Sequence, residues 1–181
     1  MNILLAFAPF IAFAVLDRLV GATPGLMAGA LVAAGLVLRD ALSTSRRVKI
    51  LEVGTVVLFG GLTCYSLVMA VTWTIVGVRL CVDAGLLVIV LLSLAVRQPF
   101  TLQYARESVA KEFWETREFL RTNDAISGVW AGAFALMVGA DLVMLYVPSV
   151  PTRVGVWVSI LAIFGAYRFT EWYPQRGRRK T

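Results

Sequence analysis

The sequence predicts an all-α protein: a polytopic bundle of six transmembrane helices with both termini in the cytoplasm. Three observations support this prediction. Hydrophobic residues make up 59% of the 181 residues and charged residues only 15%, whereas soluble domains average about 45–50% and about 25%. Apolar runs recur at lengths close to that of a membrane-spanning helix. The basic residues gather in alternate loops, as the positive-inside rule describes for multi-pass proteins.

Polar or turn-forming residues divide the chain into six expected spans within a single membrane domain, 1–181. They run over residues 2–20, 24–38, 50–71, 75–96, 125–147 and 152–172. The first span has no basic start, and Asp17 and Arg18 interrupt its far end, so we do not expect a cleaved signal peptide. Pro24 suits the first position of the second helix. The turn 72–74 separates the third span from the fourth, and the turn 148–151 separates the fifth from the sixth.

The basic residues agree with this count at every loop. Fourteen of the 17 fall on one side of the expected topology: Arg39, Arg46, Arg47, Lys49, Arg97, Arg106, Lys111, Arg117, Arg121, Arg168, Arg176, Arg178, Arg179 and Lys180. That side is cytoplasmic by the positive-inside rule. The basic tail and loops would contact anionic lipid headgroups. Arg39, Asp40, Glu52, Arg168 and Glu171 lie at this boundary, and we assign them no chemistry.

The segment 97–124 is the only long polar stretch. Pro99 ends the preceding helix, and from Tyr104 onward the charges are spaced three and four apart, as on a helix surface. Val109, Phe113 and Leu120 fall near one face of that helix, which favours an amphipathic helix lying in the cytoplasmic membrane interface. A solvated connector is the alternative. The candidate interfacial residues are Arg97, Pro99, Tyr104, Arg106, Phe113 and Trp114.

Ionisable side chains also occur inside the expected spans, where they are costly and often functional. Counted from the helix ends, three carboxylates from three helices share one depth below the outer surface. With two arginines they form a candidate polar cluster: Asp17, Arg18, Arg79, Asp83 and Asp141. Buried ion pairs that fix helix register are one interpretation. A wet outward cavity that binds a charged group or relays protons is the other.

Small residues at every fourth position predict close helix packing. Gly21, Gly25 and Gly29 form such a series in the second span, and Gly128 and Gly132 form a pair in the fifth; Gly60 and Gly61 in the third span are further candidate packing residues. We expect the second span to be a packed, central helix.

The composition gives little support to an enzyme. Histidine is absent, which removes the commonest metal ligand and general base. Cys64 and Cys81 lie in apolar runs and lack a metal-type spacing; whether they touch stays open. We therefore expect no catalytic residue, metal or cofactor, and no nucleic-acid partner for the net charge of +6.

Short motifs in this order resemble the bacterial intracellular septation protein A family. They are the opening run 5–9, Val57 to Thr63 with Gly60 and Gly61 at its centre, the basic residue and proline at 97 and 99, Trp130-Ala131, Trp157-Val158 and Pro174. The resemblance implies a polytopic protein of the bacterial inner membrane that serves cell-envelope maintenance or division through partner membrane proteins, without catalysis.

Two functions follow from the sequence. The first is a non-enzymatic inner-membrane protein that acts through other membrane proteins, including a second copy of the chain, or through lipids. The alternative is a small transporter or channel that uses the Asp/Arg cluster.

Overall fold

The computed structural model describes residues 3–43, 48–147 and 149–178. Five of its helices are long and apolar enough to cross a membrane. They are α3 (Ala22–Ala41), α4 (Ile50–Val68), α5 (Ile75–Ala95), α7 (Arg117–Tyr146) and α8 (Thr152–Arg178). The prediction of a helical protein with apolar spans is therefore confirmed in this coarser form. Arg46, Arg47, Pro148, Arg179 and Lys180, which the topology also used, lie outside the described residues.

The first expected span, 2–20, is not one continuous helix. It consists of α1 (Ile3–Ala6) and α2 (Ala8–Leu19), which are separated at Phe7. Pro9 lies in the first turn of α2; because proline has no N–H, it cannot continue the hydrogen-bond ladder from α1. With 12 residues, α2 is by itself too short to cross a bilayer, and six spans are not established.

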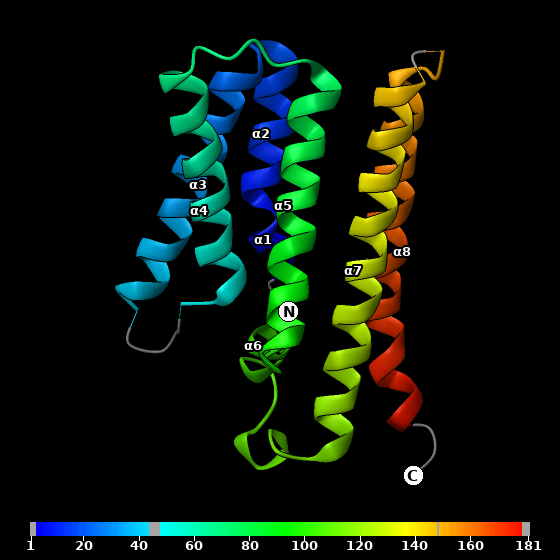
Figure 1. The fold of residues 1–181 in the computed structure, drawn as a ribbon. Coiled ribbons are helices and arrows are strands. Elements are labelled where there is room, and N and C mark those ends of the chain that lie inside the picture. The colour runs from blue at the N-terminus through cyan, green and yellow to red at the C-terminus, as the bar shows by residue number, and fades with distance from the viewer. Residues whose placement is uncertain (1–2, 44–47, 148, 179–181) are drawn as a thin grey trace. The chain divides into compact units, whose positions relative to one another are not determined.

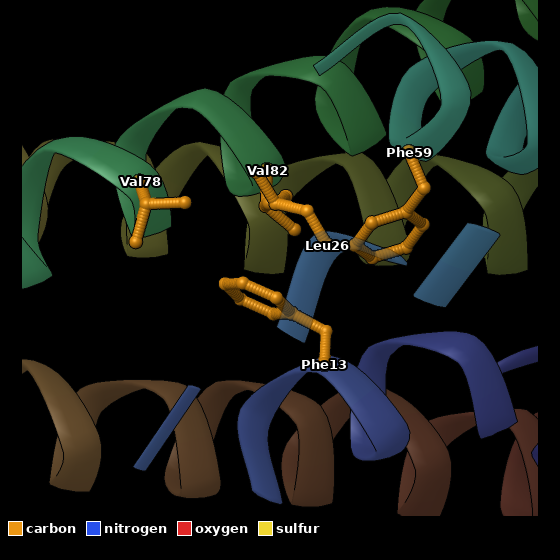
Figure 2. Close-up of a cluster of buried hydrophobic side chains, with 5 residues drawn as sticks. All are labelled: Phe13, Leu26, Phe59, Val78 and Val82. Atoms are coloured by element: carbon orange, nitrogen blue, oxygen red, sulfur yellow. The ribbon is translucent and has the colours of Figure 1, made fainter. Parts of the chain in front are cut away.

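The chain forms two compact units, Met1–Ile89 and Val90–Thr181, so α5 continues from one into the other. In the first unit α3 contacts both α2 and α4. Four helices contribute to its core, which contains Phe13, Leu26, Phe59, Val78 and Val82, all nearly inaccessible to solvent (Figure 2). Phe13 comes from α2, Leu26 from α3, Phe59 from α4 and the two valines from α5.

Two glycines of α3 let its neighbours approach closely. A Cβ added at Gly25 would lie 2.9 Å from the backbone nitrogen of Asp17 on α2, and one at Gly29 would lie 2.7 Å from the Phe59 ring on α4. Gly21 precedes the helix with φ of +117°, a conformation that favours glycine. At Gly60, Gly61, Gly128 and Gly132 an added Cβ would meet no atom of the described chain within 4 Å.

The turn from α4 to α5 is held by polar side chains. Ser66 lies 2.6 Å from the Thr23 hydroxyl and accepts a hydrogen bond from Trp73 Nε1 at 3.0 Å. Ala70 has φ of +47°, which turns the chain out of α4. Thr74 then caps α5, because its hydroxyl accepts a hydrogen bond from the backbone N–H of Gly77 at 3.0 Å.

In the second unit α7 and α8 pack side by side (Figure 1). The indole N–H of Trp130 on α7 donates to the Thr170 hydroxyl of α8 at 3.0 Å, and that hydroxyl donates to the Ala166 carbonyl at 2.8 Å. Trp130 is fully buried. The short helix α6 (Phe100–Arg106) also packs on α7.

The expected helix from Tyr104 to Leu120 is wrong. Helix α6 ends at Arg106, a 3-10 turn covers Lys111–Phe113, and α7 begins at Arg117, eight residues before the expected fifth span. The new start has a physical cause. The Thr116 hydroxyl accepts a hydrogen bond from the backbone N–H of Phe119, and such an N-cap opens a helix.

Candidate functional site

The most developed polar site of the first unit lies where α3 ends and α4 begins. Asp40 occupies the last turn of α3, Lys49 directly precedes α4, and Glu52 lies in the first turn of α4. Lys49 is extended, with φ of −103° and ψ of 148°, and its ammonium reaches across to α3. We call Asp40, Lys49 and Glu52, with Arg39 at the edge, the hairpin ion cluster.

The cluster has short, directed contacts. Lys49 Nζ donates to Asp40 Oδ2 at 2.6 Å, whereas its distance to Glu52 Oε1 is 3.5 Å. Arg39 binds Asp40 Oδ1 with two nitrogens, Nε at 2.8 Å and Nη2 at 2.6 Å. Asp40 therefore has both cations close to it, whereas Glu52 has only Lys49, at a longer distance.

Burial separates this cluster from a surface ion pair. The side chains of Asp40, Lys49 and Glu52 are 0%, 4% and 3% exposed, and only Arg39, at 38%, reaches solvent. Charges removed from water in this way carry a desolvation penalty of several kcal/mol each, so they persist only when they are paired and hydrogen-bonded. Glu52 Oε2 is buried and has no hydrogen-bond partner in the described chain.

The chemistry open to this cluster is limited to charge and protons. In the described part of the chain no group of three or more potential metal-ligating side chains comes together. The cluster contains carboxylates, an ammonium and a guanidinium, and none of these is a nucleophile of the hydroxyl or thiol type. It can join α3 to α4 and it can bind or release a proton.

The expected outer cluster comes together in part. Asp17 on α2 lies within electrostatic range of its neighbour Arg18 and of Arg79 on α5. Asp83 is buried, one helical turn further along α5. Asp141 is fully buried in α7. It belongs to the second unit, whereas the other four residues of the expected cluster belong to the first.

The candidate interfacial residues separate into buried and exposed positions. Pro99 and Tyr104 are buried, while Arg97 and Phe113 are exposed. Arg97 has φ of +55° and lies two residues after the end of α5. Arg106 lies over the ring of Trp114 at 5.3 Å, and the Trp114 indole donates to the Val109 carbonyl at 2.9 Å. These contacts fold the segment 106–114 into a compact turn.

A second polar site, which sequence reasoning did not identify, joins α6 to α7. The Thr101 hydroxyl donates to the Asn123 carbonyl at 3.0 Å and lies 2.8 Å from Ser127 Oγ. All three residues are buried. Phe100 packs edge-on against Trp130 beside them. The site therefore fixes α6 as a packed part of the second unit.

Both cysteines are free thiols, Cys64 exposed and Cys81 partly buried.

Comparisons of the chain with protein-family models, with curated protein sequences and with solved structures give no match. The class defined by the fold is a helical protein, five of whose described helices are long and apolar enough to span a membrane. The resemblance to the septation protein A family stays a prediction.

Proposed function

We propose that the protein is a non-enzymatic, multi-pass protein of the bacterial inner membrane that acts through lipids and other membrane proteins. Cell-envelope maintenance or division, which the sequence resemblance implies, is the cellular process we propose for it. Both termini and the segment 97–124 face the cytoplasm in this proposal.

One observation carries the proposal: α8 packs on α7 by one side and leaves an apolar stripe along the other. Trp157, Ile160, Leu161 and Phe164 are each at least half exposed, at the three- and four-residue spacing of one helix face. In a bilayer such a face contacts lipid or another helix. At the end of α8, Arg176 lies 3.9 Å from the centre of the Trp172 ring, a pairing suited to an interface with anionic headgroups.

Photo-crosslinking in intact membranes tests this surface. A photoreactive phenylalanine derivative replaces Phe164, which is 60% exposed, or Phe134, which is fully buried on α7 and is the matched control. At position 164 we expect adducts with lipid, with a second copy or with another membrane protein. At position 134 we expect adducts only within the chain. Adducts confined to the chain at both positions would contradict the proposal.

Deletion of the gene tests the cellular process. We expect filamentous cells or cells sensitive to detergent, restored by the wild-type gene. Normal growth and shape in the deletion strain would remove the proposed role in the envelope.

Transport is the second candidate, because Asp141 is a fully buried carboxylate within a spanning helix, and such groups often mark ion or proton pathways. Its charge would then be used when a cation or proton binds.

A further inference from the structure

The two buried carboxylates of the hairpin ion cluster are not equivalent. Asp40 receives the close contacts of Lys49 at 2.6 Å and of Arg39 at 2.6 and 2.8 Å. Glu52 has one contact with Lys49, at the limit of a hydrogen bond at 3.5 Å, and its Oε2 has none in the described chain. The same ammonium thus serves two acids and lies much closer to one of them.

We propose that Glu52 is a proton-binding site whose carboxyl is neutral while Lys49 and Arg39 both bind Asp40, so that the cluster carries one net positive charge with Arg39 at its solvent edge. The single cation near Glu52 is 3.5 Å from Oε1 and is closer to Asp40, and a buried carboxylate with such weak compensation favours uptake of a proton. A proton on Oε2 also removes a buried, ionised oxygen that no described donor reaches. This inference does not depend on the proposed function.

The groups that face Glu52 have opposing effects. The Lys49 ammonium, 3.5 Å from Oε1, and the N-terminus of α4 favour the ionised form, whereas burial and the Asp40 carboxylate on the other side of Lys49 oppose it. From α5 the neighbour at this end of α4 is Ile89, packed at Gly54. Arg46 and Arg47 of the adjoining loop lie outside the described residues. A helix N-terminus stabilises a nearby anion by only about 0.3–1 kcal/mol.

Release of the proton has a defined chemical consequence. The O–H bond of the Glu52 carboxyl breaks, the proton passes to water or buffer, and the cluster gains one negative charge. The Lys49 ammonium is then attracted by two carboxylates, while Arg39 still binds Asp40. The junction of α3 and α4 would therefore respond to the proton concentration on its side of the membrane.

Infrared spectroscopy of the full-length protein in lipid bilayers tests the proposal directly. At neutral pH we expect the wild type to show the carbonyl stretch of a protonated carboxyl that is absent from Glu52→Gln. Glu112→Gln, the same change at an exposed position outside the cluster, is the matched control and should leave the Glu52-dependent band in place. No difference between the wild type and Glu52→Gln would show that Glu52 is ionised and would overturn the proposal.

Thermal unfolding at several pH values gives an independent readout. Glutamate in an unfolded chain ionises near pH 4.3, so a folded state that retains the proton loses relative stability as the pH rises above that value. Wild-type stability should therefore fall from about pH 4.3 toward neutral, and Glu52→Gln, which mimics the neutral acid, should fold and lack this component. An identical pH dependence in both proteins, or a Glu52→Gln protein that cannot fold, would contradict the proposal.

Discussion

Lys49 and Asp40 are nine positions apart in the chain, yet Nζ of one lies 2.6 Å from Oδ2 of the other, and both side chains are almost completely buried. This contact joins the end of α3 to the start of α4. Because Lys49 also approaches Glu52, its loss would leave two buried acids with one fewer cation.

We predict that Lys49→Met lowers the free energy of unfolding by about 3–5 kcal/mol, the usual effect of removing one partner of a buried ion pair. Arg39→Met is the matched control. Arg39 is 38% exposed, and exposed ion pairs contribute about 0–1 kcal/mol. Unfolding in detergent measures both variants. Equal losses would contradict the assignment of Lys49 as the central cation.

The close approach of α2 and α3 predicts different effects of alanine at two glycines of one helix. Gly25→Ala places a Cβ 2.9 Å from the α2 backbone, which cannot adjust as a side chain can, so stability and expression should fall. At Gly35 an added Cβ meets nothing within 4 Å in the described chain. Gly35→Ala should be neutral or stabilising by up to about 1 kcal/mol. Unfolding temperatures compare the two, and equal effects would contradict the packing of α2 on α3.

The Thr101 site predicts a loss of stability with almost no change in side-chain size. Thr101→Val removes the hydroxyl that binds Asn123 and Ser127; the interior helix carbonyl of Asn123 loses a second hydrogen bond and the buried Ser127 hydroxyl loses this partner, at a cost of about 1–3 kcal/mol. Amide exchange in α6 should become faster. Thr72→Val, at an exposed turn, is the same chemical change and should have little effect. Unchanged exchange in Thr101→Val would mean that this contact does not hold α6.

The long apolar helices could be predicted from composition and run length, but the breaks between them depend on single residues. Pro9 divides the first expected span, and the Thr116 cap begins α7 before the apolar run does. A threonine followed by an acidic first turn, Thr116 before Glu118, is a known start signal. Charge spacing alone favoured one helix across this point because it contains no information about local caps.

The hairpin ion cluster could have been found only in part from the sequence. Lys49 and Glu52 have helical i, i+3 spacing, Asp40 lies just after the second expected span, and Glu52 lies in the first turn of the third, at facing ends of a hairpin. Those features place the two acids near each other. The choice of Lys49, from among the loop cations, as their buried partner depends on the extended backbone at that residue, which composition and spacing do not encode.

Single-cysteine labelling in a background without Cys64 and Cys81 tests the proposed orientation. A membrane-impermeant thiol reagent added outside spheroplasts should label Thr72→Cys and not Ser108→Cys; both positions are exposed. Permeabilised membranes should give labelling of both. The reverse pattern would invert the proposed topology.

The most direct test of the proposed non-transport function is flux in reconstituted vesicles. Vesicles that contain the wild type, Asp141→Asn or the matched control Asp124→Asn, an exposed position on the same helix, are loaded with pH- and cation-sensitive dyes. If the protein acts through interactions, all three should leak no faster than empty vesicles. A wild-type flux that persists in Asp124→Asn and is lost in a stable, folded Asp141→Asn protein would contradict this account and establish transport.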